Sequence, residues 1–276
     1  MRAELRGKRD ALLSRIGIRP VVMGILNVTP DSFSDGGLFQ ARDAAIARAQ
    51  RMVAEGCDIV DIGGESTRPG ADPVSDADEL ARIEPVVTGL ADSIDVPLSV
   101  DTYKASIASR VVELGAILIN DVWGLQKDPA MADAVAEAQA AVVIMHNRLA
   151  KDDAIDIVAD IRRFFDRSLA LAAKAGIPDE RIILDPGVGF GKTARQNRDA
   201  VARIAELGDY ARPILIGVSR KTFLGSLGGR VEGTLGGTLA ANLAAAAGGA
   251  AIFRVHDVAE HVAALKVFHM IRHGDR

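Results

Sequence analysis

The sequence contains one cysteine, Cys57, among 276 residues. A single thiol cannot form a disulfide within the chain or a cysteine cluster for a metal, and such low usage is typical of a reducing compartment. No stretch of about 18 consecutive apolar residues occurs, so we expect no membrane-spanning helix and no membrane partner. Residues 1–17 are charged and lack the apolar centre of a secretion signal. We therefore expect a cytoplasmic protein.

The chain also lacks a large excess of charge of either sign. It has 33 Lys and Arg against 37 Asp and Glu, a net charge of −4. This balance gives no general attraction for nucleic acid, so we expect no nucleic-acid partner, and an anionic ligand would need a local cationic cluster. Hydrophobic residues make up 49% of the chain, which suffices for a full core without disulfide or metal support.

Eight short apolar runs recur along the chain. They begin at residues 21, 59, 97, 117, 141, 182, 213 and 251. Each is too short for a helix and too continuous for a strand with one wet face, so the runs predict strands buried on both faces of a parallel sheet. Helical periodicity appears between them, in residues 41–55, 76–92, 104–114, 153–175 and 258–271.

Eight strands alternating with helices in a chain of this length predict the α/β class and a single (β/α)8 TIM barrel. An open, doubly wound sheet is the alternative assembly. No linker rich in proline, glycine or serine divides the chain, which favours closure. We expect one barrel domain over residues 21–276, preceded by a lead segment of residues 1–20.

Polar side chains follow all eight runs. The set comprises Asn27, Asp61, Asp101, Asn120, Asp121, His146, Asp185, Ser219, Lys221, Arg254 and His256. Parallel strands of a barrel point the same way, so these ends should meet on the face where barrel enzymes carry their active sites. One such residue usually only caps the next helix. Eight together predict a shared pocket, with the polar stretch "NVTPDSFSDGG" as a loop over it.

Three members of this set suit a planar heterocycle. A buried carboxylate such as Asp101 or Asp185 requires hydrogen-bond donors, and paired N–H groups of an amino-amide ring edge supply them. Asn120 can donate and accept side by side. The alternative is that Asp185, in "LDPG", merely starts a turn.

A second group is cationic and comprises Arg68, Arg220, Lys221, Arg254 and His256. Such a group suits a phosphate or diphosphate, which barrels often bind at the loops after strands seven and eight. Each arginine could instead be a solvated surface side chain. Arg254 and His256 either flank an inward-facing Val255 or point inward themselves.

Several long motifs occur in order: "GILNVTPDSFSDGG", "DIGGESTRPGA", "LDPGVGFGK", "GVSRKTFLG" and "RVHDV". In these motifs the chain resembles the bacterial dihydropteroate synthases, the folate-pathway enzymes of the pterin-binding barrel family, from about residue 21 to residue 266. The resemblance implies condensation of 6-hydroxymethyl-7,8-dihydropterin diphosphate with 4-aminobenzoate to give 7,8-dihydropteroate and diphosphate. It also implies an SN1-like displacement.

The resemblance also implies roles for matching residues. Asn27 corresponds to a magnesium ligand, which makes Mg²⁺ the implied cofactor. The catalytic group would be Asp101, Lys221, Arg254 and His256, with the last two anchoring the diphosphate. Pterin contacts would come from Asp101, Asn120, Met145, Asp185 and Lys221. The remaining substrate contacts would come from the aminobenzoate pocket and from the second loop near the diphosphate. These residues are Phe33, Thr67, Arg68, Pro69, Phe190 and Ser219.

Two other functions remain open. A pterin-binding methyltransferase shares the barrel and the carboxylate-amide set, although a methyl donor has no diphosphate for "SRK" and "RVH" to hold. A non-catalytic pterin- or phosphate-binding barrel is the second. The alanine-rich helix expected over residues 236–248 offers a smooth face for a twin subunit, so we expect a homodimer; packing against the core would explain that face equally well.

Overall fold

Eight parallel strands form a single sheet in the order β6-β5-β4-β3-β2-β1-β8-β7. The computed structural model describes residues 1–29, 38–66, 72–228 and 234–274. The strands are β1 (Val21–Asn27), β2 (Ile59–Gly63), β3 (Leu98–Asp101), β4 (Leu118–Asp121), β5 (Ala141–Met145), β6 (Ile182–Asp185), β7 (Leu215–Ile216) and β8 (Ile252–Val255). All eight coincide with the predicted apolar runs, and the predicted TIM barrel is confirmed.

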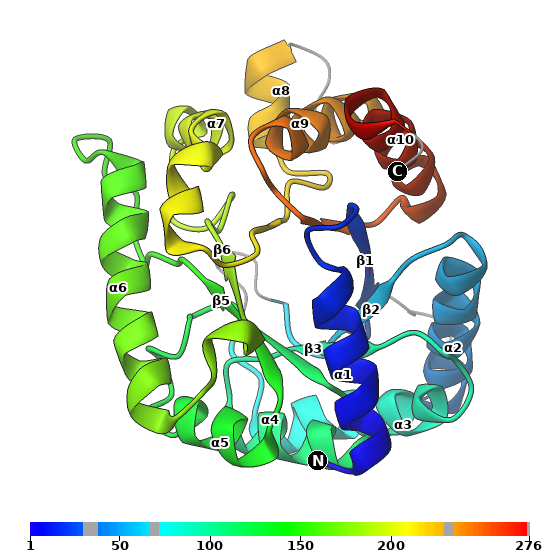
Figure 1. Cartoon of the computed structure of the whole chain (residues 1–276). Coiled ribbons are helices and arrows are strands. Elements are labelled where there is room, and N and C mark those ends of the chain that lie inside the picture. Colours follow the sequence, from blue (N-terminus) through cyan, green and yellow to red (C-terminus); the bar gives the residue numbers. More distant parts are fainter. Residues whose placement is uncertain (30–37, 67–71, 229–233, 275–276) are drawn as a thin grey trace.

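Helices surround the strands in a ring (Figure 1). They are α2 (Leu38–Ala54), α3 (Asp76–Ala91), α4 (Ala105–Leu114), α5 (Met131–Ala138), α6 (Ile157–Ala175), α7 (Ala194–Ala202), α8 (Phe223–Gly228), α9 (Leu235–Ala247) and α10 (Val258–His273). The predicted helix from residue 153 begins later, because Asp156 caps it by accepting from the backbone N–H groups of Val158 and Ala159. Among the described helices, none combines the length and apolar character that a membrane crossing requires.

The continuous apolar runs are explained by two separate cores. Along β1, Val21 and Met23 pack inside the barrel, whereas Val22 packs in the layer between sheet and helices. Successive side chains of a strand alternate between faces, and here both faces are covered. A polar residue within such a run therefore lies either inside the barrel or against a helix, with no solvent at either place.

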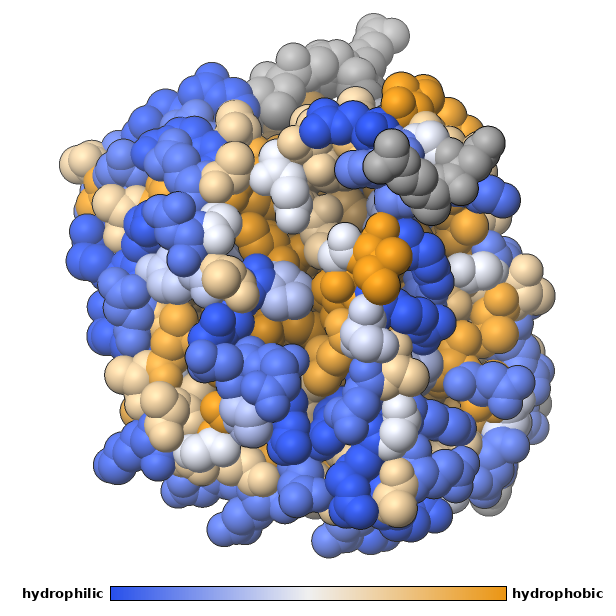
Figure 2. Space-filling view, viewed as in Figure 1, coloured by the Kyte–Doolittle hydropathy of each residue, from blue (hydrophilic) through white to orange (hydrophobic). Residues whose placement is uncertain are grey.

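The lead segment forms a helix, α1 (Ala3–Arg15), that covers the amino end of the barrel. Leu5 and Leu12 join the interior apolar cluster formed by the first residues of several strands. Arg9 is buried and donates to the backbone carbonyl of Gln139. Figure 1 shows α1 lying across the front of the strands, and Figure 2 shows the same face as largely hydrophilic with apolar side chains gathered toward its centre.

One join of the barrel is weaker than the others. Strands β6 and β7 meet through a single bridge, Leu184 to Ile214, and one backbone hydrogen bond from Leu184 to Pro213 of 2.9 Å. Strand β7 is short because Pro213 has no N–H to donate and the chain turns after Val218, whose carbonyl accepts from the Lys221 N–H. The loops that follow β6 and β7 flank this join.

Candidate active site

Strand register places the predicted polar residues in one row at the carboxyl edge of the sheet. Asn27 of β1 pairs with Gly63 of β2, Gly63 with Asp101 of β3, and Asp101 with Asn120 of β4. Two strands further on, Met145 pairs with Asp185. The prediction that distant strand ends meet is confirmed. The row at the carboxyl ends of the strands is called the rim below.

Arg254 lies inside the barrel and is held by two carboxylates. Its Nε lies 2.7 Å from Asp61 Oδ2 and its guanidinium NH2 group 2.8 Å from Asp101 Oδ2. Val255 packs outward, so the second of the two predicted orientations is correct, with Arg254 itself pointing inward. The guanidinium is thereby fixed at the rim, because two ion pairs from neighbouring strands restrict its rotamers.

Asp61, which pairs with Arg254, was predicted to lie at the shared strand ends but was given no specific role there. It is fully buried and also accepts hydrogen bonds from Ser99 Oγ at 2.6 Å and Asn120 Nδ2 at 3.1 Å. The signal was present in "IVDIGG", because a carboxylate inside a run buried on both faces must have charged or polar partners within the barrel.

Asp101 keeps one oxygen available for a ligand. Oδ2 pairs with Arg254, whereas Oδ1 is buried and has no hydrogen-bond partner among the described residues. Burial raises the pKa of Asp101, the Arg254 guanidinium opposes this, and the Asp61 carboxylate adds to it. A buried acceptor left without a donor is costly, so a ligand N–H at this position would relieve that cost.

Asp185 and Lys221 lie on either side of the loop after β6. Asp185 Oδ1 accepts from the Gly187 N–H at 2.7 Å, and burial raises the pKa of this carboxyl. Lys221 Nζ donates to the Val188 carbonyl and lies 4.7 Å from the centre of the Phe190 ring. Burial lowers the pKa of Lys221 to about 8. An acceptor, a cation and an aromatic face therefore share one corner of the rim.

Ser219 connects the loops after β7 and β8. Its hydroxyl lies 2.9 Å from His256 Nδ1 and accepts from the His256 backbone N–H at 3.1 Å. Arg220, in contrast, is exposed and pairs with Asp257. Within the predicted cationic group, Arg220 is therefore engaged by a carboxylate at the start of α10.

Four predicted site residues, Phe33, Thr67, Arg68 and Pro69, lie outside the described residues, and their roles stay predictions. Glu65, near the start of the second loop, is described, and it contacts the segment that follows β3. Its carboxylate accepts from Lys104 Nζ at 2.8 Å and from the Tyr103 hydroxyl at 2.9 Å.

The donor chemistry at the end of β1 fits a magnesium ion. A Cβ built on Gly63 would lie 3.9 Å from Asn27 Oδ1 and 4.0 Å from Asp101 Oδ2, so both oxygens lie near Gly63 at the rim. Within the described ranges, no cluster of three or more His, Cys, Asp or Glu side chains could hold a metal. Mg²⁺ often takes one or two protein oxygens and completes its shell with phosphate and water, and the amide oxygen of Asn27 is of the kind it binds.

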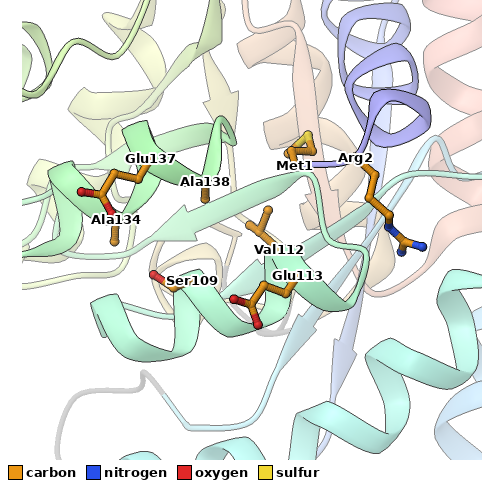
Figure 3. Close-up of a pocket in the computed structure, with 8 residues that line it drawn as sticks. All are labelled: Met1, Arg2, Ser109, Val112, Glu113, Ala134, Glu137 and Ala138. Atoms are coloured by element: carbon orange, nitrogen blue, oxygen red, sulfur yellow. The ribbon is translucent and has the colours of Figure 1, made fainter.

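A separate groove of about 530 Å³ lies outside the barrel between α4 and α5 (Figure 3). It is lined by Met1, Arg2, Ser109, Val112, Glu113, Ala134, Glu137 and Ala138. None of these belongs to the rim, and two of its three charged side chains are acidic. The groove therefore offers neither the paired acceptors nor the cations of the rim.

The chain is similar throughout to known proteins. Residues 23–256 match the family model described as pterin binding enzyme. A dihydropteroate synthase of Clostridium beijerinckii is 43% identical, with 93% of this chain and 96% of the relative covered. The corresponding enzyme of Escherichia coli is 44% identical over 90% of both chains.

Solved structures agree with these matches. Dihydropteroate synthase from Clostridium difficile, determined in the presence of pteroic acid, gives a TM-score of 0.89 at 46% identity, covering 93% of this chain and 98% of that one. The Xanthomonas albilineans enzyme with 4-aminobenzoic acid gives 0.88 at 45% identity, covering 92% and 94%. With its barrel, its rim of acids, amides and bases, and full-length similarity of this degree, the chain belongs to the dihydropteroate synthases of the pterin-binding enzyme family.

Proposed function

We propose that this chain condenses 6-hydroxymethyl-7,8-dihydropterin diphosphate with 4-aminobenzoate to give 7,8-dihydropteroate and diphosphate. The observation that carries this function is Arg254, fixed between Asp61 and Asp101 beside a carboxylate oxygen that awaits a donor. A pterin and a diphosphate are the two halves of one substrate, and the rim has acceptors for the first next to cations for the second. The Xanthomonas albilineans relative has also been solved in complex with 7,8-dihydropteroate.

The pterin ring would be held by the acidic and amide groups of the rim. Asp185 and the unpaired Oδ1 of Asp101 can accept the ring N–H groups, and Asn120 can pair with an adjacent ring nitrogen. Met145, which is buried beside Asp185 in the register, supplies an apolar floor. These groups are buried before the substrate arrives, so little reorganisation is needed when it binds.

Bond breaking requires that charge on the leaving diphosphate be neutralised. As the bond between the methylene carbon and the diphosphate oxygen breaks, the electron pair leaves with the diphosphate, and Arg254, His256 and Lys221 stabilise the growing negative charge. The arylamine nitrogen then forms the new carbon–nitrogen bond and releases one proton. The amine is already nucleophilic, so no activated serine or cysteine is required; Cys57 is buried, and burial raises its pKa to about 12.

We also propose Mg²⁺ as the cofactor, with Asn27 Oδ1 as its protein ligand and Asp101 close by. When bound, the ion would neutralise diphosphate charge during departure. The fit of the oxygen donors around Gly63 supports this proposal.

The reaction can be tested with labelled 4-aminobenzoate. We expect purified protein supplied with pterin diphosphate and Mg²⁺ to form labelled dihydropteroate, and a chelator to reduce the rate strongly, with recovery on addition of Mg²⁺. A chelator-insensitive rate would count against the ion alone. Absence of product, together with methyl transfer from methyltetrahydrofolate to a corrinoid, would instead establish the methyltransferase alternative.

The activity should decline in alkaline solution because of Lys221. Burial lowers the pKa of its ammonium to about 8, so the free enzyme loses this charge as the pH rises through about 8. We expect kcat/KM for pterin diphosphate to fall above that pH, approaching tenfold per pH unit. The Lys221→Met variant should be slower at every pH and lack this decline. A wild-type profile that stays flat to about pH 9.5 would contradict the assignment.

We further propose that the enzyme is a cytoplasmic homodimer. Helix α10 exposes Val267, Met270 and Ile271, the last with 80% of its surface accessible. Alanine-rich α9 packs beside α10 and also presents exposed alanines. Removing this adjoining apolar surface from water would favour association. The mass of the protein in solution tests this proposal.

A further inference from the structure

A buried lysine lies beneath the loop that follows β6. Lys192 is 2% exposed, and its Nζ makes three contacts: 2.8 Å to His146 Nδ1, 2.6 Å to the Gly187 carbonyl oxygen and 3.2 Å to the Phe190 carbonyl oxygen. Burial lowers the pKa of Lys192 well below that of an ordinary lysine, and all three contacts of its Nζ lie within the protein. Lys192 therefore has no remaining donor for a substrate, and its role must be exerted through the loop.

The loop held by Lys192 sets two contacts of the pterin site. The Gly187 N–H donates to Asp185 at 2.7 Å, and the carbonyl of the next residue, Val188, accepts from Lys221. Lys192 binds the carbonyls of Gly187 and Phe190, which lie before and after Val188 in this turn. One side chain thus fixes the turn that orients both the acceptor and the cation of this corner.

The turn also lies unusually close to the segment after β5. Gly187 has a φ of +65°, and a Cβ there would come within 1.8 Å of the His146 carbonyl oxygen. Gly191 has a φ of +57°, and a Cβ would lie 2.3 Å from the Arg148 carbonyl oxygen. These approaches leave no room for a side chain at either glycine, so the turn is packed directly against the segment after β5. The Gly187 carbonyl accepts from the Phe190 N–H at 3.1 Å, and Lys192 adds a second hydrogen bond to it.

His146 connects this lysine to a charged cluster at the edge of the barrel. Burial lowers the pKa of His146 to about 4, so its imidazole is neutral; Nδ1 accepts from Lys192, and Nε2–H donates to Asp160 Oδ2 at 3.2 Å. Arg148 and Arg163 pair with the same aspartate at 2.8 and 2.9 Å. The chain of contacts holds the imidazole in the one orientation that can receive the lysine.

We propose that Lys192 is a positioning residue for pterin recognition: by holding the carbonyls of Gly187 and Phe190 against His146, it sets the turn that aims Asp185 and Lys221 at the ring. Filling of space alone would explain a long apolar side chain at this position. It does not explain a buried side-chain nitrogen whose three polar contacts all lie on this turn and on the neighbouring His146.

The test compares Lys192→Met, which keeps the length and volume but removes the donors, with Lys174→Met, the same change at an exposed lysine of α6. Titration calorimetry with pterin diphosphate and Mg²⁺, without aminobenzoate, should show affinity weakened on the order of 10- to 100-fold for Lys192→Met, the scale of misplacement by about 1 Å. KM for pterin diphosphate should rise more than kcat falls. Lys174→Met should match the wild type.

A spectroscopic measurement separates positioning from a general loss of stability. In folded, ligand-free Lys192→Met, amide exchange should accelerate at residues 187–190 and remain as in the wild type in β1 to β4. If Lys192→Met does not fold, His146→Gln, which keeps both carbonyl contacts, should show the same changes to a smaller extent.

Wild-type affinity and exchange in folded Lys192→Met, or in His146→Gln where the first variant does not fold, would overturn this role. The inference rests on the proposed function, but the two can fail separately. Failure of the wild-type protein itself to bind pterin diphosphate would count against the function.

Discussion

Replacing Arg254 by methionine is expected to lower kcat/KM for pterin diphosphate by about 10³-fold or more, because the variant lacks the fixed cation that meets the departing charge. It should also destabilise the fold by about 3–5 kcal/mol, since Asp61 and Asp101 would be left buried without their common partner. Steady-state kinetics and thermal unfolding measure the two effects.

A second replacement separates these effects. Adding Asp61→Asn to Arg254→Met removes one of the two buried carboxylates left without a partner, so part of the stability should return while the rate stays low. A matched control is Arg110→Met on α4, where the arginine also pairs with two carboxylates, Glu84 and Glu113, but at the surface. Surface pairs contribute about 0–1 kcal/mol, so this control should retain activity. Full recovery of rate in the double variant would contradict a role for Arg254 in diphosphate departure.

Replacing Asp185 by asparagine should weaken binding of pterin diphosphate by about 30-fold or more, with little change in shape. The asparagine oxygen can still accept from the Gly187 N–H, but an NH2 group would replace the carboxylate oxygen that faces the ring. A donor would then face donors, and loss of a buried charged hydrogen bond typically costs about 2–5 kcal/mol. Calorimetry measures the change. Asp209→Asn at an exposed position is the control, and unchanged affinity in Asp185→Asn would exclude this carboxylate from the pocket.

The barrel and the row of rim residues were predictable because they depend on local patterns. Continuous apolar runs identify strands buried on both faces, and parallel strands bring their carboxyl ends together whatever their separation in sequence. Asp101, Asn120 and Asp185 could therefore be placed at one edge from the sequence alone.

The pairing of side chains across the barrel could not be predicted in this way. Asp61 and Arg254 are separated by 193 positions, and which partner a guanidinium chooses depends on strand register and on rotamers. Arg220 illustrates the limit, because its motif indicated an anion site whereas its side chain pairs with Asp257. Lys192 was equally hidden, since a lysine in a glycine-rich loop normally indicates an exposed charge.

The single bridge between β6 and β7 gives substrate binding a mechanical consequence. Asp185 is the last residue of β6 and Lys221 follows β7, and the contact from Lys221 to Val188 already crosses between the two strands. A pterin ring bound by both side chains would connect the two strands where backbone hydrogen bonds between them are few. Pterin binding should therefore stabilise the barrel between β6 and β7, so that substrate binding and completion of the sheet are coupled.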